Sequence, residues 1–206
     1  MLTDRTVTSL LEAFSAADPT PGGGSAAALV GATGTALLAM VAGMPKSRTN
    51  AIAEREALDH AQTELLALRD TLAGLIDRDA SAYDLVIAAF RKPKGTDEEK
   101  AERKAAVQDA TRVATEVPLE TIRACVAAMR AGLATAIHGN PSAASDAKVG
   151  FRLLMAAAEG ARDNVDINIG GLADPAVQAT IRDEAERLMA EAVTHTSSVL
   201  SVPQAP

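Results

Sequence analysis

One aspartate occupies a position where a carboxylate is costly. Residues recurring in alternating steps of three and four predict one buried helix face, formed by Leu65, Leu68, Leu72, Leu75, Asp79, Ala82, Val86 and Ala89. Asp79 lies within this face, whereas Asp77 and Arg78 fall beside it and should be solvated. Burial disfavours an ionised carboxylate and raises its pKa, which suits a general acid or base near neutral pH. A structural aspartate, paired with a backbone donor or an arginine to fix helix register, is the alternative.

Two carboxamides end a second stripe of small residues. The stripe consists of Leu153, Ala157, Gly160, Asn164 and Asn168. Small side chains let a partner helix or a ligand approach the backbone, and an asparagine both donates and accepts, as recognition of a polar heterocycle requires. Hydrogen bonding between helices would use the same groups, so both interpretations stay open. Asp146, near the start of the same predicted helix, is where the helix dipole favours negative charge.

A glycine-rich turn precedes a predicted helix. The run is Pro21-Gly22-Gly23-Gly24-Ser25, followed by three alanines. Free backbone amides at a helix N-terminus can hold a carboxylate, a phosphate or a developing oxyanion. The run lacks the G-x-x-x-x-G-K-[ST] spacing of a phosphate-binding loop, and no strand pattern precedes it. Gly22, Gly23, Gly24 and Ser25 are therefore candidates for positioning a substrate rather than a nucleotide.

The histidines and the single cysteine predict neither a metal site nor a cofactor. His60, His138 and His195 share no metal-ligand spacing. Cys125 alone cannot form an internal disulfide and is expected to pack as a small hydrophobic residue. We therefore expect no metal and no cofactor.

The basic residues fall in two groups. One group is interleaved with acids and is expected to form a solvated face: Lys92, Lys94, Lys100, Arg103 and Lys104. The other group, Lys46 and Arg48, directly follows an uncharged segment and could meet an anionic tail of a substrate.

The elements that must position these residues are helices throughout. The pattern predicts helices over residues 6–17, 25–43, 48–91, 96–117, 118–138, 141–169 and 175–199, with Pro118 either kinking one helix or beginning another. Thr96 and Glu99 have the spacing of a capping box. We expect an all-α fold with a single domain over residues 1–206, built as an elongated antiparallel bundle of long helices and completed as a homodimer by a second copy.

Composition excludes several classes of protein. Of 206 residues, 45 are alanine and only four are aromatic, which favours close helix packing over a β-sandwich or a base-stacking surface. The net charge of −7 argues against nucleic acid or an anionic membrane as a partner. Residues 26–44 have the hydropathy of a membrane span, but their alanines, glycines and threonines favour a central bundle helix. With one cysteine and no apolar leader, we expect a cytoplasmic protein.

The same segments resemble the formiminotetrahydrofolate cyclodeaminase / methenyltetrahydrofolate cyclohydrolase family. An opening signature and five blocks follow in order: Pro19 to Ala28, Asp77 to Tyr83, Pro93 to Lys100, Val117 to Glu120, Gly139-Asn140 with Ser145-Asp146, and Asn164 to Asn168. The resemblance implies an elongated helical homodimer acting on tetrahydrofolate derivatives, with Asp79 as proton donor and acceptor. The Gly22–Ser25 turn would position the substrate, Asn164 and Asn168 would read the pterin edge, and Asp146 would orient one of these groups. Residues 44–50 lack the aromatic that relatives often have there.

Two reactions fit this resemblance. We expect hydrolysis of 5,10-methenyltetrahydrofolate to 10-formyltetrahydrofolate, because no transferase segment accompanies the chain to supply a formimino substrate. The alternative is cyclodeamination of 5-formiminotetrahydrofolate, which releases ammonia and forms the methenyl compound. A non-catalytic helical dimer or partner-binding module is a third interpretation, from a different class of protein.

Overall fold

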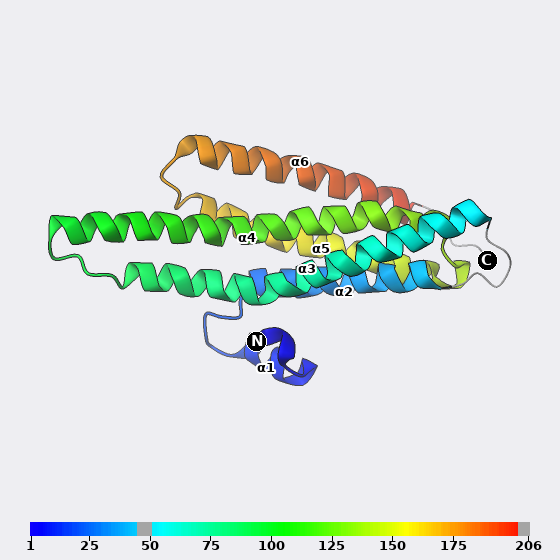
Figure 1. Cartoon of the computed structure of the whole chain (residues 1–206), viewed down its shortest axis with the longest axis horizontal. Helices are drawn as coiled ribbons and strands as arrows, with labels where there is room; N and C mark the ends of the chain where they lie inside the picture. Colours follow the sequence, from blue (N-terminus) through cyan, green and yellow to red (C-terminus); the bar gives the residue numbers. More distant parts are fainter. Residues whose placement is uncertain (45–50, 202–206) are drawn as a thin grey trace.

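The computed structural model of the protein describes residues 1–44 and 51–201, which contain six α-helices and no strand. The elements are a 3-10 helix η1 (Leu2–Asp4), α1 (Val7–Ser15), α2 (Gly23–Gly43), α3 (Ile52–Phe90), α4 (Asp97–His138), a second 3-10 helix η2 (Pro141–Ala143), α5 (Ala144–Ile169) and α6 (Pro175–Leu200). The predicted all-helical fold is confirmed. Figure 1 shows the long helices lying side by side in an elongated bundle, with α1 outside it.

The two longest helices, α3 and α4, are joined by a short turn at one end of the bundle (Figure 1). The predicted capping box begins α4. The Thr96 hydroxyl accepts from the Glu99 amide at 3.2 Å, and the Glu99 carboxylate accepts from the Thr96 amide at 3.1 Å. Two amides that have no partner inside the helix are thereby bonded, which fixes where α4 starts.

Helix α4 continues through Pro118, so the alternative of a separate helix beginning there is wrong. Proline has no N–H and cannot donate to the carbonyl four residues earlier. That carbonyl belongs to Ala114, and it accepts instead from the side-chain amide of Asn168 on α5 at 2.7 Å. A neighbouring helix therefore supplies the hydrogen bond that Pro118 removes.

The core lies where α2 packs against α3, α4 and α5. On α3 five of the eight predicted seam residues are buried, and Leu65, Leu72 and Leu75 are at most 1% exposed. Helix α2 is long and apolar enough to cross a membrane by length and composition, and half of it is buried inside the protein. At Gly34 an added Cβ would lie 2.8 Å from the carbonyl oxygen of Gly150, so the backbones of α2 and α5 are in direct contact. Small residues thus allow the tight packing that the composition predicted.

Candidate active site

A cleft of about 310 Å³ opens where the start of α2 meets α3, α4 and α5. It is lined by Pro19, Thr20, Gly22, Gly23, Gly24, Asp79, Ala82, Tyr83, Val86, Ala114, Asn164, Ile167 and Asn168. Its volume lies within the range of small-molecule sites. Six of the eight predicted site residues therefore come together from α3, α5 and the N-terminal end of α2 with its N-cap: Gly22, Gly23, Gly24, Asp79, Asn164 and Asn168.

Asp79 is the one carboxyl group among the described residues that line this cleft. Its side chain is half-buried on the α3 seam, and burial raises the pKa of the carboxyl above its ordinary value. The Ser25 hydroxyl, 2.9 Å from Oδ2, and the Ser25 backbone N–H both oppose this rise without cancelling it. Asp79 is therefore a carboxyl whose proton is retained to higher pH than in water, which is the property a general acid or base needs.

Gly24 makes room for this carboxylate. A Cβ placed on Gly24 would lie 2.1 Å from Oδ1 of Asp79 and 2.6 Å from its Cγ. Any other residue would push the carboxylate away from the first turn of α2. The glycine-rich turn therefore leaves space for the Asp79 side chain. We expected the N-terminus of this helix to face a ligand, and in the structure it lies against Asp79.

Ser25 lies behind the aspartate instead of in the cleft, which corrects its predicted role as a substrate contact. The residue is fully buried, and its hydroxyl is 2.9 Å from both Oδ2 of Asp79 and the carbonyl oxygen of Ile76. A hydroxyl has one proton for these two acceptors. It can donate to the ionised carboxylate, or accept from the protonated one while donating to Ile76. The Ser25 hydroxyl can thus form a hydrogen bond with Asp79 in both protonation states of the carboxyl.

The two asparagines use their amide nitrogens inside the protein. Asn164 Nδ2 donates to the Gly160 carbonyl at 2.8 Å, and Asn168 Nδ2 donates to the Ala114 carbonyl at 2.7 Å. The interpretation as a hydrogen bond between helices is therefore confirmed for the nitrogen of Asn168, which reaches α4, whereas the Asn164 bond lies within α5. Both residues also line the cleft, and among residues 1–44 and 51–201 neither Oδ1 has a hydrogen-bond donor. Each can accept one from a ligand.

The structure does not bring Asp146 to this group. Asp146 lies in the first turn of α5, eighteen residues before Asn164, which corresponds to about 27 Å along the helix. Within one chain it cannot orient either asparagine, and its position agrees with the alternative of a residue favoured by the helix dipole. Lys46 and Arg48 lie outside the described residues.

Of the two residues that precede Asp79, only Asp77 is less solvated than expected. Asp77 accepts from the Leu2 amide at 2.5 Å and from the Thr3 hydroxyl at 3.0 Å, which ties η1 to α3. Arg78 is exposed as expected, and it pairs with Glu120 on α4. Two of the sequence blocks are therefore joined by an ion pair next to the cleft.

Tyr83 is a further lining residue whose place in the cleft could be predicted from its spacing. It follows Asp79 by one helical turn, lines the same cleft and is 37% exposed. The signal was its spacing of four from the seam aspartate in a chain that has a single tyrosine. Ile167, which is 78% exposed, adds an apolar wall from α5 that no pattern indicated.

The remaining candidates stay outside the cleft. The described residues contain no group of three or more His, Cys, Asp or Glu that could hold a metal ion. Cys125 is fully buried, and burial raises the pKa of its thiol to about 12. Such a thiol is inert at neutral pH, as expected of a packing residue.

Comparisons with known proteins agree on one family. The sequence pattern described as formiminotransferase-cyclodeaminase matches residues 6–187. The chain is 38% identical to a methenyltetrahydrofolate cyclohydrolase of Methylorubrum extorquens, over 93% of this chain and 92% of that protein. It is 35% identical to the formimidoyltransferase-cyclodeaminase of Sus scrofa, over 87% of this chain but only 33% of that longer protein. A crystal structure of a formiminotetrahydrofolate cyclodeaminase from Thermotoga maritima has the same fold, with a TM-score of 0.86 at 23% identity over 97% of this chain and 96% of that one.

Proposed function

The chain belongs to the formiminotransferase-cyclodeaminase family, and from this premise we propose that it hydrolyses 5,10-methenyltetrahydrofolate to 10-formyltetrahydrofolate. The observation that carries the proposal is the half-buried Asp79, facing a cleft of small-molecule size with its pKa raised by burial. The similarity to the Methylorubrum extorquens cyclohydrolase over nearly the full length of both chains supports it further.

In the proposed mechanism Asp79 acts twice. The ionised carboxylate takes a proton from a water that attacks the carbon bridging N5 and N10, and a neutral tetrahedral intermediate forms. The protonated Asp79 then gives this proton to N5 as the bond between that carbon and N5 breaks. The new hydroxyl loses its proton to solvent, leaving a formyl group on N10. One carboxylate alternating between base and acid is sufficient, without metal or cofactor.

The other lining residues would hold the substrate. The free Oδ1 atoms of Asn164 and Asn168 suit the N–H donors on the edge of a pterin. Tyr83 offers an aromatic ring one turn from Asp79, which compensates for the missing aromatic in residues 44–50. Backbone at Gly22 and Gly23 lets the substrate approach closely, while Ser25 sets the proton affinity of Asp79.

Cyclodeamination is the second candidate reaction. The relatives that favour it are the Sus scrofa protein and the solved structure from Thermotoga maritima, whose names include cyclodeaminase. Here N10 would attack the formimino carbon on N5 and lose its proton to the ionised Asp79. The protonated Asp79 would then give this proton to the amino group, which leaves as ammonia. The same carboxyl serves both reactions because each passes through a tetrahedral carbon between N5 and N10.

The assembly we propose is a cytoplasmic homodimer of single-domain chains with antiparallel long helices, which binds neither nucleic acid nor membrane. The support for the homodimer is the outer face of α2, where no charged residue occurs. This α2 stripe consists of Ala26, Val30, Thr33, Leu37 and Met40. An uncharged stripe on one side of a half-buried helix is suited to packing against a second copy.

A spectroscopic assay tests the proposed reaction and separates it from the second candidate. Purified protein is mixed with 5,10-methenyltetrahydrofolate in one cuvette and with 5-formiminotetrahydrofolate in another, and the methenyl absorbance is followed. We expect decay in the first cuvette faster than in buffer alone. A rise in the second cuvette with no accelerated decay in the first would assign cyclodeamination instead. Flat traces from folded protein would contradict both reactions and favour a non-catalytic module.

A further inference from the structure

One segment of the family resemblance contributes no side chain to the active-site cleft. The segment is Val117 to Glu120 on α4, and none of its four residues is among those that line the cleft. Glu120 pairs with Arg78 on α3, and Val117 and Leu119 are buried in the core. Pro118 is buried as well, but a proline inside a helix weakens that helix. Its place in α4 therefore needs a further reason.

The effect of Pro118 reaches the cleft through the carbonyl of Ala114. Proline lacks the N–H that would bond this carbonyl in a regular helix, and its ring crowds the same oxygen. Ala114 lines the cleft, and Nδ2 of Asn168 on α5 donates to its carbonyl oxygen at 2.7 Å. Pro118 thus places a carbonyl without its helical donor at the wall of the cleft, within reach of a second lining residue.

Asn164, one turn earlier on α5, shows the arrangement that forms without such a carbonyl. Its Nδ2 donates to the carbonyl of Gly160 on its own helix at 2.8 Å. The equivalent acceptor for Asn168 is the carbonyl of Asn164, four residues earlier, but the Asn168 amide reaches across to α4 instead. A carbonyl without its helical donor gains more from a new hydrogen bond than one that is already bonded. The difference between the two asparagines therefore follows from Pro118.

The bond to Ala114 decides which atom Asn168 offers to a ligand. A carboxamide has a donor end and an acceptor end. If the Asn168 amide were reversed, its oxygen would face the Ala114 carbonyl oxygen with no proton between them, so the nitrogen must point to Ala114. Oδ1 is then left for the cleft, where it has no hydrogen-bond donor among residues 1–44 and 51–201.

We propose that Pro118 is a positioning residue for substrate binding. By releasing the Ala114 carbonyl it holds Asn168 with Oδ1 available to the ligand, so that the cleft selects a heterocycle whose edge carries N–H donors. The nature of this heterocycle, a reduced pterin, rests on the proposed function. Pro118 therefore lowers the stability of α4 and in return fixes an acceptor in the cleft.

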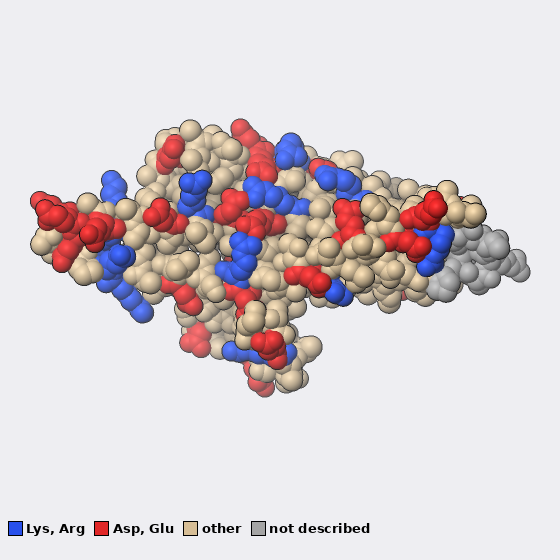
Figure 2. Space-filling view, viewed as in Figure 1, with Lys and Arg blue, Asp and Glu red and all other residues tan. Residues whose placement is uncertain are grey.

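A cycle of two substitutions tests whether Pro118 acts through Asn168. P118A restores an N–H that can bond the Ala114 carbonyl, which releases the Asn168 amide from its single orientation. N168A removes the acceptor itself. For the parent, P118A, N168A and P118A/N168A, we would measure KM and kcat with 5,10-methenyltetrahydrofolate, Kd for tetrahydrofolate by calorimetry, and Tm. None of these substitutions changes a charge, so the mixed acidic and basic side chains that Figure 2 shows along the bundle attract the substrate equally in all four proteins.

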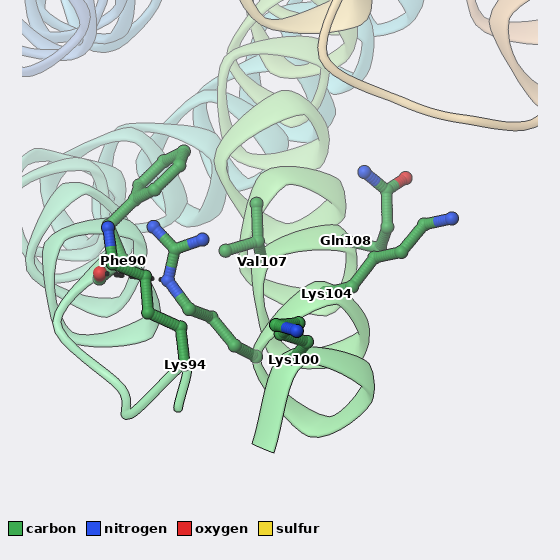
Figure 3. A pocket seen from close by; sticks show the side chains of 7 residues that line it. Phe90, Lys94, Lys100, Lys104, Val107 and Gln108 are labelled. Atoms are coloured by element: carbon green, nitrogen blue, oxygen red, sulfur yellow. Dashed lines mark hydrogen bonds between the residues drawn. The ribbon is translucent and has the colours of Figure 1, made fainter. Parts of the chain in front are cut away.

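The matched control is Q108A. The Gln108 side chain also holds the end of α5 to α4, since its Nε2 donates to the Gly171 carbonyl at 3.0 Å and its Oε1 accepts from the Ala173 amide at 2.7 Å. Gln108 lies outside the cleft and lines a separate hollow of about 350 Å³ near the α3–α4 turn, where Figure 3 shows it extending from α4 away from Phe90. Q108A therefore loosens the same region without releasing the Asn168 amide.

We expect P118A to raise KM and Kd about three- to tenfold, with kcat within about twofold of the parent. Its Tm should not fall, because α4 gains a hydrogen bond while the ligand loses a fixed acceptor. In the N168A background, P118A should change KM by less than about twofold, since the residue through which it acts is gone. Q108A should lower Tm and leave KM within about twofold of the parent value.

Three results would overturn the positioning role: an unchanged KM in P118A, an equal rise when Asn168 is already alanine, or the same rise in Q108A. Calorimetry separates this role from the proposed reaction. If the Kd values for tetrahydrofolate follow the expected pattern and the parent turns over no methenyl substrate, the reaction is lost and the role of Pro118 is kept. Turnover by the parent with KM and Kd unchanged in P118A gives the reverse.

Discussion

At the scale of single residues, the central feature is a carboxyl held between two opposing influences. Burial on the α3 seam raises the pKa of Asp79, and the hydroxyl and backbone N–H of Ser25 lower it. The seam position was predictable from the spacing of leucines alone. The contact with Ser25 was not, because spacing within one helix does not say which residues of another helix it will meet. The same limit applies to Gly24. Glycine is required at this position because a side chain would meet the Asp79 carboxylate, and not because of any turn conformation.

Replacing Ser25 by alanine should move the pH dependence of the reaction. The Ser25 hydroxyl lowers the pKa of Asp79, so its removal raises that pKa further. The proposed mechanism needs ionised Asp79 as the base, and activity is therefore lost as pH falls through its pKa. The acidic limb of kcat/KM against pH should shift to higher pH in S25A, with activity at high pH kept within a few-fold. T71A, which removes an exposed hydroxyl from α3, should leave the limb in place. A limb that stays fixed in S25A would contradict this role.

Replacing Gly24 by alanine should displace the carboxylate. The added Cβ would lie 2.1 Å from Oδ1, so either Asp79 or the start of α2 must move. A displacement of about 1 Å in a catalytic group can cost on the order of a hundredfold in rate. The control is G74A, on α3, where an added Cβ meets nothing within 4 Å and should add about 0.5–1 kcal/mol of stability. Full kcat/KM in G24A would show that the Asp79 position is not critical.

At the scale of elements, Pro118 and Asn168 are coupled through the Ala114 carbonyl. The sequence left open whether Pro118 bends a helix or begins one, because proline is compatible with either. Asn168, fifty residues later, decides that the helix continues. Pro118 leaves the Ala114 carbonyl without a donor, and the side-chain amide of Asn168 donates to it instead. Helix limits, the capping box and the α3 seam depend on nearby residues and were predictable. The pairing of Arg78 with Glu120 and the docking of Asn168 depend on contacts between helices, and were not.

A double-mutant cycle measures the coupling free energy between Pro118 and Asn168. N168A should reduce the free energy of unfolding by about 1–3 kcal/mol, because it leaves the Ala114 carbonyl without a partner. In the P118A background, the new amide at position 118 can bond that carbonyl, and N168A should then cost less than about 1 kcal/mol. Urea unfolding of the four proteins gives the coupling. Equal costs of N168A in the two backgrounds would refute the link between Pro118 and Asn168.

At the scale of the whole molecule, helix α2 has two different sides. One packs against α3, α4 and α5, and the other presents the α2 stripe without a charged residue. Composition predicted a central helix, but it could not say how much of that helix the chain itself would cover. The side of α2 that the rest of the chain leaves uncovered supports the proposal of a homodimer.

A charge placed on the α2 stripe should therefore separate the two copies. Met40 is 44% exposed at one end of the stripe, and M40E would bury a carboxylate at the proposed contact. Light scattering on a sizing column should give the parent protein at twice the chain mass of 21.2 kDa and M40E at the chain mass. V193E, at a 50% exposed residue of α6, a helix that packs on α4 and α5, should stay dimeric. A parent protein that is monomeric, or that partitions into lipid vesicles, would contradict the proposed assembly.

The central claim for the whole molecule is that Asp79 performs the proton transfers. The variant D79N keeps the size and shape of the side chain but removes the carboxyl group that transfers the proton. The ionised form is disfavoured by burial, so the raised pKa of Asp79 costs stability at neutral pH, and the asparagine removes that cost. D79N should melt no lower than the parent at pH 7, on the order of a few degrees higher. This difference should vanish below the ordinary carboxyl pKa, where Asp79 is protonated both folded and unfolded. A folded D79N is thus the expected starting material.

The measurement is the decay of methenyl absorbance with D79N beside the parent protein, at equal concentration and with folate binding checked by calorimetry. The predicted result is a kcat lowered by about 10²–10⁴, with folate still bound. A folded D79N that binds folate and turns over 5,10-methenyltetrahydrofolate at the rate of the parent would contradict the account.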